Sequence, residues 1–154
     1  MAFPTSGIFA ATMTDVFDAS QAAIDLDVET SKVALYTDSV TGADLDTDTA
    51  YNVGAWASNE VPNGTGYTTG GELLTGTTFL ASAGVTTWDA VDTPWTSATF
   101  SSVRGCLIYA DYLATPVADA GVIALNFGAD YGVTSGTFTV QWNVSGIFTI
   151  NWTP

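Results

Sequence analysis

Alternation of apolar and polar residues dominates the second half of the chain and predicts β-strands. Short runs rich in Thr, aromatic and β-branched residues are separated there by turn residues, a spacing typical of antiparallel sandwiches and barrels. The last two runs alternate most strictly, and the short segment between them contains Gly146, so we expect them to form a hairpin. The predicted strands are 72–80, 85–91, 95–101, 103–111, 121–127, 137–143 and 147–152.

The first part of the chain carries one helical pattern. Residues 1–7 are expected to form a short arm, because Pro4 and Gly7 interrupt regular structure. Residues 8–19 predict a helix, with Ser6 as its N-cap. Residues 24–29 then alternate between apolar and acidic side chains, and the run from Lys32 to Thr37 predicts a strand. The apolar face of the predicted helix consists of Phe9, Met13, Val16 and Phe17.

Residues 38–71 form a long loop-rich segment. A short helix at 50–57 is compatible with the pattern, but Gly and Asp predominate, and Gly64, Gly66, Gly70 and Gly71 follow one another closely. Long loops in compact domains usually carry function. We therefore expect one mainly β domain over 1–154, an antiparallel sandwich or barrel with a short N-terminal helix, a loop-rich interaction segment at 38–71 and a main β region at 72–154.

Charge excludes several classes of function. The 154 residues carry a formal net charge of −14, from 16 acids against Lys32 and Arg104. Such a chain repels nucleic acid and anionic lipid, and it has few cations to hold phosphate groups. The sequence has no His, which excludes a Ser-His-Asp or Cys-His nucleophile system. Its single cysteine, Cys106, lies in an apolar run and is expected to be a buried free thiol.

Carboxylates are the one plentiful reactive group. Asp44, Asp46 and Asp48 have the spacing of a calcium loop, but Thr49 and Ala55 occupy the positions where an EF-hand needs Gly and Glu. We expect solvated loop carboxylates and no metal or other cofactor. A glycosidase would need only two carboxylates and a pocket, yet the strict alternation around Trp142 is that of core residues. We therefore predict that the chain is not an enzyme.

Four residues are candidates for contacts with a neighbouring subunit. Phe3 lies in the predicted arm, and Trp56 and Tyr67 flank the Gly-rich loop, where aromatic side chains are suited to anchor a docking arm. The alternative is that this loop is ordered and covers the β-sheets. Arg104 starts a predicted strand, and it could pair with a carboxylate of its own chain or of another subunit.

The order of segments resembles small acidic virion structural proteins of tailed bacteriophages. A short helix leads to IDLDVETSKVALYT, an Asp/Thr loop and NEVPNGTGYTTGG, and then to WDAVDTPWTSATFSSVRGCLIYAD and NFGADYGVTSGTFTVQWNVSGIFTINW. This order covers nearly the whole chain. The resemblance implies a non-enzymatic particle component, with a capsid decoration (cement) protein favoured and a tail, receptor-binding or carbohydrate-binding component as the alternative.

The resemblance also sets expectations for partners and location. A decoration protein binds the major capsid protein on the outside of the shell, so we expect a virion location after synthesis in the bacterial cytoplasm. Closed symmetry favours a homo-oligomer, most simply a trimer, and many copies would make weak contacts add up. No secretion signal or membrane-spanning apolar run is present in the sequence, and neither nucleic acid nor a membrane is expected as a partner.

Overall fold

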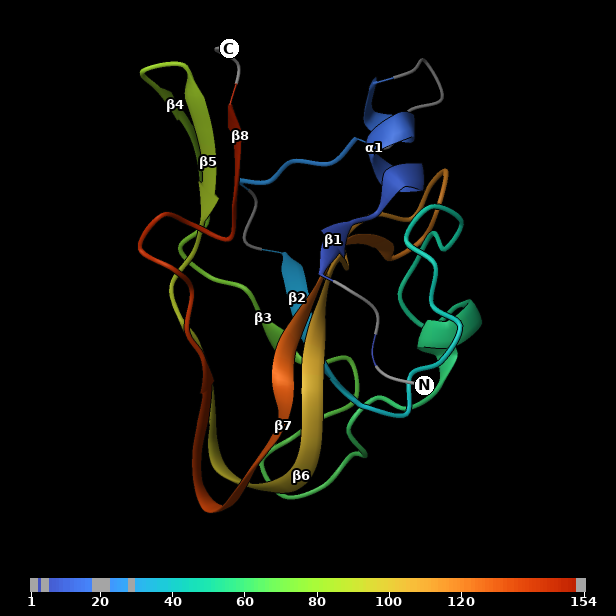
Figure 1. Ribbon diagram of the computed structural model, residues 1–154, viewed down its shortest axis with the longest axis vertical. Coiled ribbons are helices and arrows are strands. Elements are labelled where there is room, and N and C mark those ends of the chain that lie inside the picture. Colours follow the sequence, from blue (N-terminus) through green and yellow to red (C-terminus); the bar gives the residue numbers. More distant parts are fainter. Residues whose placement is uncertain (1–2, 4–5, 18–22, 28–29, 152–154) are drawn as a thin grey trace.

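The computed structural model describes residues 3, 6–17, 23–27 and 30–151, and it consists mainly of antiparallel β-sheet (Figure 1). A five-stranded sheet has the order β1-β7-β6-β2-β3, and a three-stranded sheet has the order β4-β5-β8. The predicted fold class, mainly β with a short N-terminal helix, is confirmed. The elements are β1 (Gly7–Ile8), α1 (Ala10–Phe17), β2 (Ser31–Thr37), the 3-10 helix η1 (Gly54–Ala57), β3 (Glu72–Leu73), β4 (Thr78–Ser82), β5 (Val85–Asp89), β6 (Thr93–Ala110), β7 (Ala120–Val140) and β8 (Phe148–Asn151).

The centre of the five-stranded sheet, formed by β2 and the last part of β6, is buried on both faces. Val33 and Leu35 of β2 point to one core cluster, which includes Trp88 of the smaller sheet. Ala34 and Tyr36 point to a second cluster on the opposite face. Because successive side chains of a strand point to opposite faces, a strand covered on both sides has a continuous apolar sequence. This explains the runs VALY in β2 and CLIYA in β6.

The strands β6 and β7 form a long, bent ribbon. They have 18 and 21 residues, and their pairing register shifts at several places. Ser97, Ser102 and Ser135 have positive φ angles near these shifts, which is how β-bulges bend a strand. Figure 1 shows the ribbon turning sharply at the end of the molecule farthest from α1. Because of this continuity, the predicted strands 95–101 and 103–111 are one strand, and 121–127 and the first part of 137–143 belong to another.

The predicted hairpin at the C-terminus is wrong. β7 pairs with β6, whereas β8 pairs with β5 in the other sheet. The side chain of Asn143 accepts the Ser145 amide at 2.9 Å, and the Gly146 amide donates to the Asn143 carbonyl at 2.7 Å. This local turn redirects the chain between the two sheets and does not fold β8 back onto β7.

The helix and the first long strand follow the sequence patterns, with one correction. α1 covers the predicted helix from Ala10 to Phe17, and residues 18–19 lie outside the described residues. β2 matches the predicted strand within one residue. Ser6 is not the N-cap of α1, because its hydroxyl accepts a hydrogen bond from the Asn126 amide at 2.8 Å. Ser6 instead fixes the chain entering β1 against β7.

The loop-rich segment packs against both faces of the larger sheet, because Val61 and Tyr67 belong to the cluster of Val33 and Leu35. Val40 and Trp56 are fully buried and pack with Tyr36 and Phe9. Of the helix predicted at 50–57, only Gly54–Ala57 is helical, as η1. Farther along, Gly71 has a φ angle of +77°, and a side chain there would collide with the Val33 carbonyl. Glycine therefore allows the loop to approach β2 closely.

Candidate functional site

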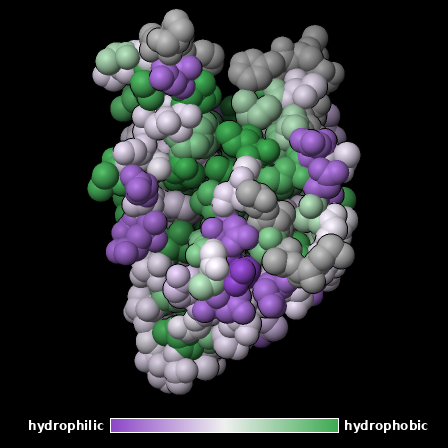
Figure 2. Space-filling view, viewed as in Figure 1, coloured by the Kyte–Doolittle hydropathy of each residue, from purple (hydrophilic) through white to green (hydrophobic). Residues whose placement is uncertain are grey.

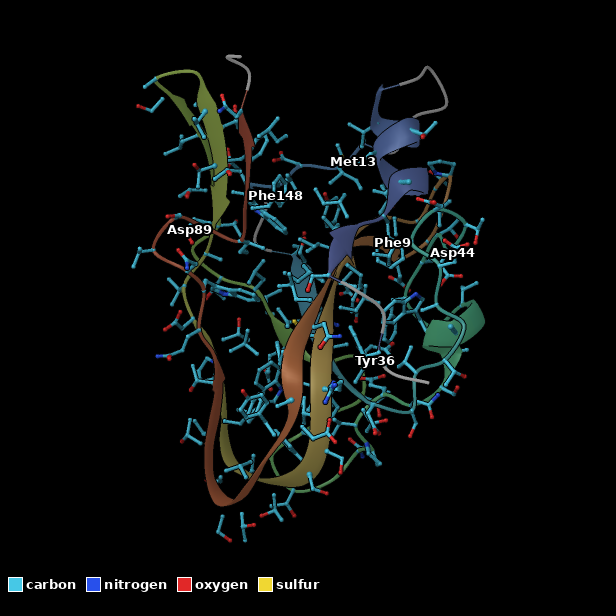
Figure 3. All side chains as sticks on the ribbon, in the orientation of Figure 1. Phe9, Met13, Tyr36, Asp44, Asp89 and Phe148 are labelled. Atoms are coloured by element: carbon cyan, nitrogen blue, oxygen red, sulfur yellow. The ribbon has the colours of Figure 1, made fainter. Side chains whose placement is uncertain are left out.

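An apolar groove lies between α1 and the three-stranded sheet. Its volume is about 560 Å³. One wall comes from α1, with Met13 and Val16, and the other from β8, with Phe148 and Ile150. Figure 2 shows hydrophobic residues gathered in a hollow between two lobes of the molecule, and Figure 3 shows Met13 and Phe148 on its two sides. The other lining residues are Ile8, Thr12, Ala23, Ile24, Asp25, Leu26, Asp27, Phe79 and Val122.

The sequence periodicities build both walls. Phe9, just before α1, is buried in the core, while Met13 of α1 is half-buried and Val16 is 38% exposed. The apolar face of the helix therefore extends from the core into the groove. On β8, Phe148 lies opposite Trp88 in register and Ile150 lies opposite Thr86. Phe148 and Ile150 are two positions apart, so they share one face of the sheet.

The segment 23–27 lines the groove and is hydrogen-bonded to residues in and beside the smaller sheet. The Trp88 indole donates to the Leu26 carbonyl at 2.9 Å, and the Thr77 hydroxyl donates to the Asp27 carbonyl at 2.9 Å. The Phe79 amide donates to the Asp27 carboxylate. Alternation continues here without a strand, because Ile24 and Leu26 are half-buried while Asp25 and Asp27 are exposed. The groove therefore has an apolar interior and two acidic side chains at its wall.

Several other carboxylates hold loops in place. Asp48 accepts hydrogen bonds from the Asp44 amide and the Trp56 indole, both at 3.0 Å. Asp92 accepts the Trp142 amide at 2.9 Å. Among the described residues, no group of three Asp, Glu or Cys side chains could hold a metal ion. The Asp44–Asp48 loop, on the α1 side of the molecule in Figure 3, thus uses its carboxylates as hydrogen-bond acceptors.

Glu60 forms the centre of a tyrosine cluster. Its carboxylate accepts hydrogen bonds from the hydroxyls of Tyr51 and Tyr67, each at 2.7 Å, and from the Gly70 amide at 2.6 Å. Burial raises the pKa of Tyr67 well above its usual value, and the negative charge of Glu60 raises it further. Charge-assisted bonds of this kind are stronger than neutral ones. The cluster therefore fastens the Gly-rich loop to the sheet with its tyrosines kept protonated.

Three of the four predicted interface residues lie inside the chain's own core. The exposed fractions are 3% for Phe3, 1% for Trp56 and 2% for Tyr67. The Trp56 ring contacts Phe3 with centroids 5.7 Å apart and Tyr36 with centroids 5.2 Å apart. Tyr67 stacks on Trp95 at 6.3 Å. These contacts are those expected if the loop is ordered and covers the β-sheets. A docking role for the loop stays a prediction, and it would require other, exposed residues of the loop.

Arg104 and Lys32 both form ion pairs within the chain. Arg104 Nη1 lies 3.1 Å from Asp130 Oδ1, and Lys32 Nζ lies 3.0 Å from Asp111 Oδ2. Both pairs are partly exposed. This geometry is the intrachain alternative for Arg104. Contact of Arg104 with another subunit stays a prediction.

Cys106 is fully buried in β6. Burial raises the pKa of its thiol, so the nucleophilic thiolate form is disfavoured.

The residues that form the groove were not singled out by the sequence patterns. Phe148 and Ile150 read as core positions of a hairpin, and Met13 reads as part of a helix face. The available signal was the apolar face of the predicted helix, which includes Met13 and Val16. The groove wall opposite the helix depends on the pairing of β8 with β5. The alternation of apolar and polar residues does not show which strands pair.

No helix among the described residues is long and apolar enough to cross a membrane. The chain matches no protein-family model, no curated protein and no solved structure.

Proposed function

We propose that this chain is a non-enzymatic structural protein of a bacteriophage virion, a decoration protein that binds the outside of the major capsid shell and stabilises it. The observation that carries the proposal is the open apolar groove between α1 and β8. Apolar surface left open on a folded chain favours association, because covering it releases water. We name the capsid shell as the partner because the order of segments resembles that of phage virion proteins.

The use of polar groups supports binding over catalysis. Asp27, Asp48 and Glu60 accept backbone or aromatic hydrogen bonds that hold loops in place. Burial raises the pKa of the Cys106 thiol and of Tyr67, so both side chains stay protonated near neutral pH. These three carboxylates therefore hold the chain's own loops in place, and the groove offers shape and apolar area for binding.

The net charge of −14 is compatible with a role on a particle surface. Copies repel one another in solution, which opposes aggregation before assembly. On a shell, many copies attach side by side, and oligomerisation would make individually weak contacts sufficient.

The test uses phage heads that lack this protein, prepared by deleting its gene. Purified protein is added, and binding is measured by co-sedimentation and by the temperature at which the heads release DNA. We expect saturable binding and a higher release temperature. Purified tails serve as the control particle. Binding to tails and not to heads, or to neither, would refute the decoration role.

A second candidate function is adhesion to carbohydrate. A groove of about 340 Å³ lies on the bent ribbon and is lined by Tyr131, Phe127, Phe138, Thr139, Val140 and Gln141. Tyr131 is 49% exposed, so its ring is available to stack on a sugar. A glycan array probed with the wild-type protein and with Tyr131→Ala tests this candidate. A signal that Tyr131→Ala abolishes would favour adhesion over decoration.

A further inference from the structure

We infer that the groove receives an extended polypeptide strand of the capsid shell, which adds to the edge of β8 and places apolar side chains between β8 and α1. The strand we specify alternates apolar residues with polar ones and carries Lys or Arg beside its apolar positions. This inference rests on the proposed function, because it names the part of the shell partner that the groove binds.

The position of β8 favours a polypeptide over a compact ligand. Among the described residues, β8 is the last strand of the order β4-β5-β8, and its stretch Phe148–Ile150 pairs with β5 alone in that sheet. Its sequence is Phe-Thr-Ile-Asn, and its pairing with β5 has no register shift. Natural edge strands are usually blunted with Lys, Pro or a bulge, because an exposed edge is a template for another strand. The stretch Phe148–Ile150 has none of these, and it borders the groove.

The side chains around this edge match an added strand. Phe148 and Ile150 lie on the face of the sheet that lines the groove, together with Phe79. A strand beside β8 continues this face, so every second side chain would enter the groove. There they would meet Met13 and Val16 of α1. The groove thus supplies pockets for alternate side chains, while β8 supplies backbone hydrogen bonds.

Charge identifies a cationic partner and disfavours a second copy of the chain. Asp25 and Asp27 line the groove. A second copy would bring another 16 acids, and its two cations, Lys32 and Arg104, already form ion pairs with Asp111 and Asp130. Complementary charge favours association, whereas like charges facing each other oppose it. A shell segment of this kind would place its apolar residues in the groove interior and its Lys or Arg residues beside Asp25 and Asp27.

The test compares two matched substitutions in the full chain. Val16→Asp places a charge in the groove, and Val53→Asp places the same charge at an exposed position just before η1 (the two valines are 38% and 51% exposed). Binding to heads that lack the protein is measured by titration. We expect Val16→Asp to weaken binding by roughly tenfold or more, as for a buried contact at an interface centre, and Val53→Asp to change it by less than about twofold.

A second variant and a second measurement keep the test independent of folding. Asp25→Asn keeps the side-chain oxygen that accepts the Asp27 amide and removes the charge. We expect it to weaken binding and to lower its salt dependence. Hydrogen exchange measured by mass spectrometry should show slower exchange over 148–150 in the head-bound protein than in the free protein.

The outcomes separate this inference from the proposed function. If the wild type binds heads but Val16→Asp and Asp25→Asn bind equally well, or 148–150 gains no protection, the strand inference is wrong and decoration stands. If the wild type does not bind heads, both fail. Concentration-dependent protection of 148–150 without heads would identify a second copy as the occupant. Protection that is complete in the free monomer would identify a segment of the same chain. Either result overturns the inference.

Discussion

The hydroxyl of Tyr67 donates a hydrogen bond to the carboxylate of Glu60 at 2.7 Å, and both residues lie in the loop-rich segment. The same hydroxyl accepts the backbone amide of Leu35 in β2 at 2.9 Å. One phenol therefore joins the loop to the centre of the larger sheet. These two hydrogen bonds fix a segment that has little regular structure. Without the hydroxyl, the Leu35 amide and the Glu60 carboxylate would each lose a partner, and leaving buried polar groups unpaired is costly.

Replacing Tyr67 by Phe should destabilise the fold. Tyr67→Phe removes the hydroxyl and leaves the Leu35 amide buried without this partner. We expect the free energy of unfolding to fall by about 1–3 kcal/mol, measured by urea denaturation. The control is Tyr131→Phe on the exposed ribbon, which should change it by less than about 0.5 kcal/mol. Equal effects of the two substitutions would contradict the role assigned to Tyr67.

Stability should decrease at alkaline pH. Burial first, and then nearby acids, raise the pKa values of Tyr36, Tyr51, Tyr67 and Tyr109 above the ordinary value of 10.0. Their unfolded forms ionise near that value, so the stabilisation they contribute is fully present below about pH 10 and is lost as the pH rises beyond it. Phenolate absorbance at 295 nm should therefore appear together with the loss of the circular dichroism of the fold. Titration of every tyrosine near pH 10 in a protein that remains folded would show this interpretation to be wrong.

The thiol of Cys106 should be unreactive in the folded protein. The side chain is completely buried, and burial raises its pKa. Reaction with an aromatic disulfide reagent then requires the sheet to open, so we expect it to be at least about a hundredfold slower than in unfolded chains. The reaction is followed by absorbance, with protein in guanidinium chloride as the reference for one thiol per chain. Rapid reaction without denaturant would contradict the burial of Cys106 in β6.

The ion pair of Arg104 should contribute little to stability. Arg104 and Asp130 are 25% and 44% exposed at their side chains, and exposed pairs are typically worth about 0–1 kcal/mol. Arg104→Gln should therefore lower the free energy of unfolding by less than about 1 kcal/mol in thermal or urea melts. The same variant tests the predicted interface role. Weaker binding to heads at unchanged stability would place Arg104 at the interface, and unchanged binding would leave it with the intrachain role alone.

The sequence patterns predicted strands well where local chemistry determines them. The run from Lys32 to Thr37 is a strand because its apolar residues are buried on both faces of the sheet. Alternation identified β5 and β8 within two residues at each end. The predicted strand 72–80 is wrong as a single strand, because it covers β3 and the start of β4, which lie in different sheets. Division of the long ribbon into separate strands failed, because Ser97, Ser102 and Ser135 bend the strands without ending them.

Partners of the strands and the location of the site depend on distant residues. A short Gly-containing segment before β8 resembles a hairpin turn, but Ile147 donates its amide to the Trp88 carbonyl at 2.7 Å and β8 continues along β5. Trp56 and Tyr67 belong to a loop rich in Gly and Asp, and sequence alone does not distinguish an aromatic anchor for a partner from one for the chain's own sheet. The groove arises only once α1 and β8 are placed side by side.

The pairing of β8 with β5 has a consequence for biosynthesis. β4 and β5 leave the ribosome long before β8, so Phe79 and Trp88 lack their ring contacts with Phe148 until β8 has been made. The smaller sheet can therefore be completed only after β8, Phe148–Asn151, has been synthesised.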